Sequence, residues 1–231
     1  MSSTAKFTAK LDPYFHPAAL WNRDYREQAL QLSSSRPVRI AIERPDGTSW
    51  IHETTLLPEE PQFASQNWTY GERLIKFLLW AQGGSRIRIA GAPQLVSRLQ
   101  ETYTTGGRRA FDYDFFNGPC FGTFTIESAK WEALEAKQSK SYGGANPLKG
   151  NRIGFDLGGS DRKCAALIDG EVVFSEEIKW SPYFEGDPEY HRAGIADSLK
   201  RAAAHLPQVD AIGGSAAGIY IDNEPRVGSL F

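Results

Sequence analysis

The chain has 231 residues, of which 23% are charged and 41% apolar, and its formal net charge is −2. Such a length suits one or two globular domains of about 100–200 residues each. The chain has no basic excess with which to bind a phosphate backbone, so we expect no nucleic-acid partner. No apolar run approaches the roughly 18 residues that span a membrane, and the N-terminus lacks the apolar core of a secretory signal. We therefore expect no membrane association.

The two cysteines, Cys120 and Cys164, lie far apart in the sequence and form no C-x-x-C pair. Cys164 falls inside an apolar run, where a buried free thiol is the expected state. Disulfides are rare in the cytoplasm, and nothing in the cysteine spacing calls for one. These features predict a reduced, cytoplasmic protein.

The sequence is predicted to divide into four parts, because its polarity and periodicity change at three places. These parts are an N-terminal helix and serine linker (1–35), an α+β domain (36–136), a linker (137–150) and a second domain (151–231). The linker, KQSKSYGGANPLKG, is polar and contains glycine and proline, which are typical of connecting segments.

The α+β domain is predicted to open with a hairpin, since Val38, Ile40 and Ile42 alternate before a turn at Asp46-Gly47. Thr69 followed three residues later by Glu72 is a capping-box spacing, which predicts that a helix begins there. The elements expected further on are a strand over 87–90, a helix over 94–102, a half-buried strand over 111–115, a strand over 121–126 and a short helix over 131–136.

The second domain begins with apolar runs that are separated by turn residues. Ile153-Gly154-Phe155 leads into Asp156-Leu157-Gly158-Gly159-Ser160, and a second run starts at Cys164. That run ends at Asp169-Gly170, a pair that strongly favours a tight hairpin turn. The pattern predicts strand, glycine turn, strand, tight turn and strand.

The glycine turn offers two interpretations. It can be a hairpin that needed two small residues, or it can be an anion site, because backbone comes close to a ligand where no Cβ intervenes. Successive N–H groups in such a turn suit phosphate, and Ser160 and Lys163 add a hydroxyl and a cation. Asp156 would be costly to bury unpaired, and a hydrated Mg²⁺ carried by a nucleotide would satisfy it.

The run D-L-G-G-S-D-R-K at 156–163 resembles the first phosphate-binding loop of the sugar-kinase, Hsp70 and actin superfamily. It is most similar to the ROK family of bacterial sugar kinases and repressors, which typically has D-I-G-G-T-x-x-K there. The resemblance implies that Asp156 acts through the metal of MgATP and that Gly158, Gly159 and Ser160 face its phosphates, with Lys163 nearby. Asp161 departs from the pattern, which usually has Asn or Lys at that position.

A second block is consistent with the same resemblance. Asp187-Pro188 predicts a helix start, and apolar residues at helical spacing follow as far as Pro207. A strand is expected over 209–212, followed by a glycine-rich turn that resembles the segment near the sugar site of ROK proteins. The resemblance places Gly213, Gly214 and Gly218 close to the sugar, whereas small residues for packing are the alternative.

The resemblance implies an α/β fold, in which a ribonuclease H-like (actin-like ATPase) partial first lobe follows the α+β domain. The order hairpin, helix, strand occurs in both halves, so the α+β domain could be a diverged repeat of the lobe. No general base matches the family motif, since Asp222 lies outside it, and no catalytic residue is assigned within the chain. Kinases of this type need such a base, so we expect this chain alone to be inactive.

We therefore expect the N-terminal part of an ROK-like, ATP-dependent sugar kinase, with ATP and Mg²⁺ as cofactors and a hexose or amino sugar as substrate. The first alternative is a non-catalytic sugar sensor or regulator with the same fold. The second is another branch of the superfamily, such as an ATPase activator or an acetate-kinase-like enzyme. A homodimer remains an open question.

Overall fold

A computed structural model describes residues 9–13, 15–118, 121–137, 148–221 and 224–228. The chain divides into two compact units, Met1–Lys140 and Ser141–Phe231, and each is described here by itself. Both units combine helices with a mixed β-sheet, so the α/β class expected from the sequence is confirmed. Among the described residues, no helix is both long and apolar enough to cross a membrane.

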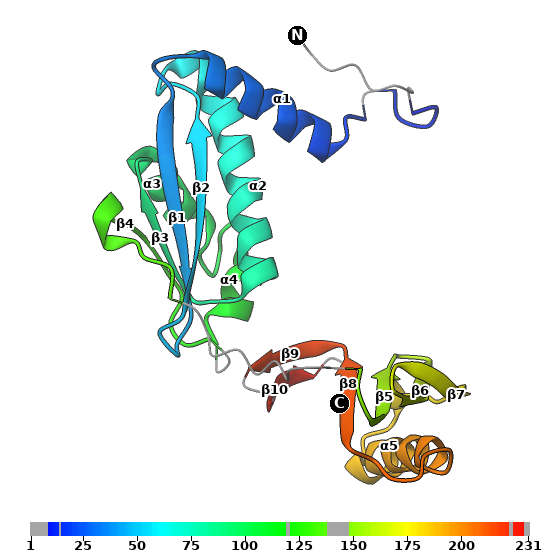
Figure 1. Cartoon of the computed structure of the whole chain (residues 1–231). Coiled ribbons are helices and arrows are strands. Elements are labelled where there is room, and N and C mark those ends of the chain that lie inside the picture. Colours follow the sequence, from blue (N-terminus) through cyan, green and yellow to red (C-terminus); the bar gives the residue numbers. More distant parts are fainter. Residues whose placement is uncertain (1–8, 14, 119–120, 138–147, 222–223, 229–231) are drawn as a thin grey trace. The chain divides into compact units, whose positions relative to one another are not determined.

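The first unit is built on a four-stranded sheet with the order β2-β1-β3-β4 (Figure 1). The strands are β1 (Arg36–Glu43), β2 (Ser49–Leu56), β3 (Arg86–Ala90) and β4 (Thr125–Ser128). β1 is antiparallel to β2 and β3, while β3 and β4 are parallel. The hairpin predicted around Asp46-Gly47 is confirmed, and Gly47 has a φ of 80°, which favours glycine.

Helices cover one face of this sheet. They are α1 (Ala18–Gln31), α2 (Ala64–Gln82), α3 (Pro93–Thr102) and the short α4 (Ala110–Phe116), with 3₁₀ turns η1 (Pro61–Phe63) and η2 (Trp131–Ala133). α2 contacts β1 and β2, and α3 contacts β3 and β4. The alternating residues Ile40 and Ile42 are buried, as are Ile75 and Leu79 of α2 and Leu99 of α3. Burial of these aliphatic side chains is the main force that joins helices to sheet.

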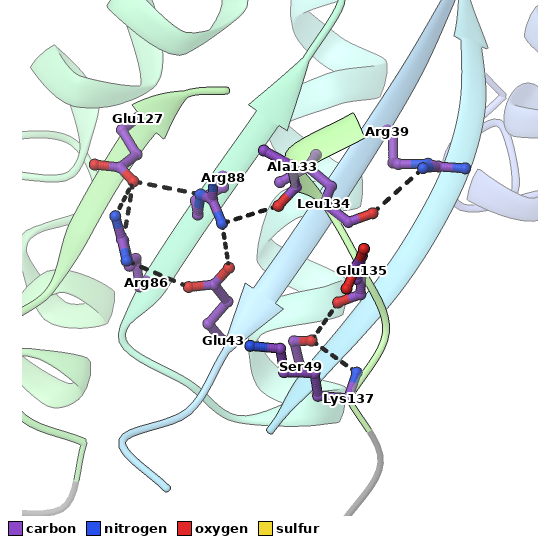
Figure 2. A network of polar contacts seen from close by, with 10 residues as sticks. All are labelled: Arg39, Glu43, Ser49, Arg86, Arg88, Glu127, Ala133, Leu134, Glu135 and Lys137. Carbon is purple, nitrogen blue, oxygen red and sulfur yellow. Dashed lines mark hydrogen bonds and ion pairs between the residues drawn. The ribbon is translucent and has the colours of Figure 1, made fainter. Parts of the chain in front are cut away.

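On the other face lies a segment that we call the strap, residues 129–137. Its apolar residues pack with Ala41 and Ala90, which are fully buried beneath it. Guanidinium groups of the sheet donate to its carbonyls: Arg39 to Trp131 and Leu134, and Arg88 to Ala133, each at 3.3 Å. Figure 2 shows these arginines together with the ion pairs that link Glu43, Arg86, Arg88 and Glu127.

Two predictions for this unit are wrong. The alternating aromatics at 111–115 form helix α4, because Phe111 and Phe115, four residues apart, both stack against Trp80 of α2. Helix α2 begins at Ala64, and Thr69 lies within it, so the capping box does not form. Glu72 is instead buried and pairs with Arg109. The strand predicted at 121–126 overlaps β4 only at residues 125 and 126, and the short helix predicted at 131–136 is the 3₁₀ turn η2. Cys120 lies outside the described residues.

The second unit contains the four strands and the helix predicted for it, in the predicted order, together with a 3₁₀ turn and two further strands that were not predicted. They are β5 (Asn151–Leu157), β6 (Asp161–Ile168), β7 (Glu171–Lys179), η3 (Pro182–Phe184), α5 (Pro188–Ala203), β8 (Ala211–Ala216), β9 (Gly218–Ile221) and β10 (Glu224–Gly228). The sheet order is β7-β6-β5-β8, with β8 parallel to β5, and β9 pairs separately with β10. Asp187 caps α5 as expected, since its side chain accepts from the N–H of Glu189 at 2.9 Å.

Helix α5 covers one face of the second sheet. Its Ala202 packs with Ile153, Cys164 and Ala166, all of which are buried. Cys164 is a free thiol, as predicted, and burial raises its pKa. Because side chains alternate across a strand, the neighbours of these residues on β5 and β6 point to the opposite face. That opposite face carries Asp156 and Lys163.

The two sheets differ in one respect that bears on the idea of a diverged repeat. In the second unit, β5 precedes the β6–β7 hairpin and lies between β6 and β8. In the first unit, β3 pairs directly with β1, and its sheet has no counterpart of β5 among the described residues. The two units are therefore alike in their order of hairpin, helix and strand. They differ in β5, the strand that carries Asp156, which, in the part of the chain that the structure describes, has a place only in the second sheet.

Candidate functional site

The glycine turn connects β5 to β6 and is closed by one backbone hydrogen bond. The N–H of Gly158 donates to the carbonyl of Asp161 at 2.9 Å. A Cβ at Gly158 would lie 2.9 Å from that carbonyl oxygen, and one at Gly159 would lie 2.6 Å from the ring of Tyr183. Both glycines are thus required by close approach of neighbouring atoms, and any side chain at either position would displace the turn.

Trp180, at the end of the third strand, binds two carbonyls of this turn. Its indole N–H donates to Gly158 at 2.7 Å, and its backbone N–H donates to Ser160 at 3.1 Å. In the described part of the chain, no group accepts from the N–H of Gly159 or Ser160. The turn therefore has the carbonyls of Gly158 and Ser160 occupied and two successive N–H groups available, which is the polarity of an anion site.

Asp156 lies one residue before the end of β5, on the open face of the sheet. Its carboxylate accepts a hydrogen bond from the hydroxyl of Ser215 on the neighbouring parallel strand β8. Across the antiparallel pair, its register partner is Lys163 of β6, whose own partner on β7 is Glu177. The open face therefore carries a transverse row of Ser215, Asp156, Lys163 and Glu177 at the end of the sheet next to the turn.

Asp161 complicates the anion site, because its carboxylate occupies both groups that were expected to assist a phosphate. The hydroxyl of Ser160 donates to it at 2.9 Å, and the ammonium of Lys163 forms an ion pair with it. The hydrogen bond with Lys163 lowers the pKa of Asp161 and raises the pKa of Lys163. An internal anion thus lies beside the turn.

The buried face of β6 connects the same turn to α5. Arg162, which is only 8% exposed, donates to the carbonyl of Gly194 at 2.7 Å and to the hydroxyl of Ser198. It also donates to the carboxylate of Asp197 at 2.7 Å. This hydrogen bond is the main cause of the lowered pKa of Asp197. Arg162 thereby holds the start of β6 in place against the helix.

The three glycines expected near a sugar do not form the predicted turn. Gly213 and Gly214 lie within strand β8, and Gly218 begins β9 with a φ of 145°. A Cβ at Gly214 would lie 2.1 Å from the ring of Phe155, so this glycine is required for packing. Gly213 pairs in register with Gly154, and the same row continues with Ala165 and Ser175, which makes the open face flat.

Sequence reasoning found Asp156 and the turn but missed Ser215, Trp180 and the role of Asp161. Ser215 and Trp180 reach the turn only through strand pairing and chain return, so no local motif marks them. Asp161 was visible as a departure from the family pattern. In the described residues no three acidic, histidine or cysteine side chains gather as a metal-ligand set. A single carboxylate such as Asp156 suits Mg²⁺ that retains its waters and arrives with a nucleotide.

No known protein family matches this chain, and no curated protein resembles it closely enough to be counted as a relative. The geometry of the turn and the open sheet face therefore carries the functional argument.

Proposed function

We propose that the second unit is the phosphate-binding lobe of an ROK-like, ATP-dependent sugar kinase with a ribonuclease H-like fold. The observation that carries this proposal is the polarity of the glycine turn. Trp180 binds the carbonyls of Gly158 and Ser160, and the N–H groups of Gly159 and Ser160 are left for a ligand. Two adjacent N–H donors and a nearby ammonium provide a site for the charge of a phosphate.

The position of Asp156 supports the same proposal. It lies at the end of β5 beside the turn, and Ser215 orients its carboxylate. Asp156 would hold a hydrated Mg²⁺ ion brought in with a nucleotide, and such an ion would supply charge neutralisation for phosphoryl transfer to a sugar hydroxyl. The order of strands and helix in the unit is the one that the ROK resemblance implies. Because no general base is assigned within the chain, binding is expected without transfer.

The proposal can be tested by amide NMR of the full chain titrated with MgATP and with magnesium pyrophosphate. We expect saturable shifts of the Gly159 and Ser160 amides, and a weaker response in Asp156→Ala at an unchanged melting temperature. The matched control is Asp210→Ala, which removes a carboxylate at the opposite end of the sheet. Shifts that spare the turn, or an Asp156→Ala response equal to wild type, would contradict the proposal.

One observation favours the second candidate, a non-catalytic sugar sensor of the same fold. The carboxylate of Asp161 already binds Ser160 and Lys163, and its charge repels an incoming phosphate. A sensor would bind a hexose or amino sugar without a nucleotide. Calorimetry with glucose, glucosamine and MgATP separates the two candidates, because binding of a sugar in the absence of any nucleotide response supports the sensor.

A further inference from the structure

The first unit contains a cavity of about 280 Å³ between the end of strand β2, η1 and the first turns of α2 and α3. Its volume is close to the lower end of small-molecule sites, which run from about 300 Å³ upwards. The apolar part of its lining comes from Leu56, Leu95 and Trp68. Leu56 and Leu95 are buried, so the hydrophobic surface is held firmly in place.

Charged groups of both signs line this cavity. Arg36 and Glu59 neutralise each other across 2.9 Å. Arg98 lies over the ring of Trp68, 4.1 Å from its centroid, and the carboxylate of Glu60 accepts a hydrogen bond from the side-chain amide of Gln62 at 2.8 Å. Within the described part of the chain, neither Arg98 nor Glu60 has an oppositely charged group within 4.0 Å. The cation of Arg98 and the anion of Glu60 therefore both line the cavity without forming an ion pair with each other.

The wall that carries Glu59 and Glu60 is fixed from behind. Asn67 donates to the carbonyls of Leu57 and Pro58 at 3.1 and 3.3 Å, and it accepts a hydrogen bond from the hydroxyl of Tyr25. The same hydroxyl accepts from the N–H of Leu57 at 3.2 Å. Burial raises the pKa of Tyr25 to about 12, so this hydroxyl keeps its proton at neutral pH. Preorganised side chains of this kind lower the cost of binding a ligand.

We propose that this cavity binds a small zwitterion, a molecule with an ammonium group and a carboxylate or phosphate. The anionic group binds the guanidinium of Arg98, which packs on the ring of Trp68 and can donate two parallel hydrogen bonds. The ammonium group binds Glu60, and the body of the molecule contacts Leu95 and Trp68. Such a ligand pairs both charges at once, whereas an ordinary anion or cation would leave one of them unpaired.

The shared chemistry has two sources, a free α-amino acid or a phosphorylated amino sugar, and calorimetry on the full chain distinguishes them. The first arm uses leucine, with isocaproate, which lacks the ammonium, and isoamylamine, which lacks the carboxylate. The second arm uses glucosamine phosphate, with glucose phosphate as the analogue that has a hydroxyl in place of the ammonium. In at least one arm the zwitterion should bind about tenfold tighter than each analogue with a single charge.

Variants locate the binding. Arg98→Gln and Glu60→Gln should each lower the affinity for the zwitterion by about tenfold, with unchanged melting temperatures. The matched control is Arg73→Gln, because Arg73 also lies over a tryptophan, Trp21 at 5.9 Å, but away from this cavity. The affinity of the Arg73→Gln variant for the zwitterion should equal that of the wild-type protein.

Three results would overturn the proposal. These are no binding of either zwitterion up to about 10 mM, equal affinity for a zwitterion and its singly charged analogue, or wild-type affinity in Arg98→Gln. Binding in the leucine arm alone identifies the amino acid, and binding in the glucosamine phosphate arm alone identifies the phosphorylated amino sugar.

Discussion

Asp161 is the residue on which the phosphate site depends most directly. It holds the hydroxyl of Ser160 and the ammonium of Lys163, the two side-chain groups that a phosphate would otherwise engage. Its carboxylate and a bound phosphate would repel each other at close range. Under the proposed function, a nucleotide would have to displace this ion pair or bind through the backbone N–H groups alone.

Removing that charge should strengthen nucleotide binding. We expect Asp161→Asn to raise the affinity for MgATP by about tenfold, the equivalent of one pKa unit of interaction. Glu171→Gln, which removes a carboxylate at the far end of β7, should leave the affinity unchanged. Calorimetric titration of the three proteins is the measurement. Equal or weaker binding by Asp161→Asn would show that this carboxylate does not oppose the ligand.

Asp197 should make the stability of the second unit fall at acidic pH. Its pKa lies below the ordinary value of 3.8, first because Arg162 donates to it. A carboxyl with a lowered folded-state pKa adds stability above its unfolded pKa, and this stability is lost as the pH falls through the folded value. Urea unfolding of wild type and Asp197→Asn should therefore converge as the pH drops below about 4.

The size of this effect is limited, because 42% of the Asp197 side chain is exposed and solvent screens the pair. We expect a difference of less than about 1 kcal/mol at neutral pH. If the free energies of unfolding of the two proteins differed by the same amount at every pH, Asp197 would not be the source of the acid dependence.

For single residues, the sequence predicts those members of the candidate site that are neighbours along the chain. Asp156, the two glycines and Ser160 form one segment, and the structure places them at a single turn. Ser215 and Trp180 could not be predicted, because they reach that turn through the parallel pairing of β8 and the return of the chain after β7. Their roles depend on three-dimensional register, which no short motif records.

Among the elements, α4 shows how tertiary contacts decide between two periodicities. Aromatic residues at 111, 113 and 115 fit a strand, while those at 111 and 115 also fit one face of a helix. Trp80 selects the helix, because it stacks on Phe111 and Phe115 and donates its indole N–H to Asp112 at 2.6 Å. Segments such as α3 and the strands β5, β6 and β7 were predictable because only one periodicity fitted them, whereas β9, β10 and the glycine-rich part of β8 were not predicted as strands.

Asp112 should therefore be essential to the stability of the first unit. It is only 2% exposed, and besides Trp80 its carboxylate lies 3.4 Å from Lys76 and 3.7 Å from Arg109. We expect Asp112→Ala to reduce the free energy of unfolding by about 1–3 kcal/mol, since it removes the buried acceptor that Trp80, Lys76 and Arg109 share.

The control lies on the same helix. Asp114 is exposed, and Asp114→Ala should change the free energy of unfolding by less than about 0.5 kcal/mol. Urea unfolding followed by tryptophan fluorescence measures both variants. A similar loss in the two would mean that α4 responds to its helix propensity and not to the contacts of Asp112.

On the scale of the whole molecule, the chain contains two mixed sheets, one in each unit, and the sheets differ in how many of their faces are covered. In the first unit the strap covers the face that the helices leave free, whereas α5 covers one face of the second sheet and the row containing Asp156 lies on the other. The candidate site and the proposed zwitterion cavity therefore belong to separate units, and each can be tested by variants in its own unit.

The strap should depend on Arg39, whose guanidinium lies 4.5 Å from the centroid of the Trp131 ring and donates to Trp131 and Leu134. In Arg39→Met we expect the amide of Leu134 to exchange with solvent about tenfold faster, because the two hydrogen bonds from Arg39 to the strap are lost and the guanidinium contact that remains is that from Arg88 to Ala133. Hydrogen exchange followed by NMR is the measurement.

Arg86→Met is the matched change, since Arg86 pairs with Glu43 and Glu127 and makes no bond to the strap (Figure 2). Exchange at Leu134 should stay at the wild-type rate in that variant. Faster exchange in both variants would indicate that the charged ladder as a whole, and not Arg39, holds the strap.

The end of the strap also determines where mechanical tension enters the first unit. At Lys137 the chain pairs with Ser49, through backbone bonds in both directions and through the Ser49 hydroxyl. Among the described residues, these contacts are the first that a pull along the chain from the C-terminal side would reach. We expect them to break before the strap lifts from the buried alanines, because the strap follows β4 in the chain and ends at this pairing.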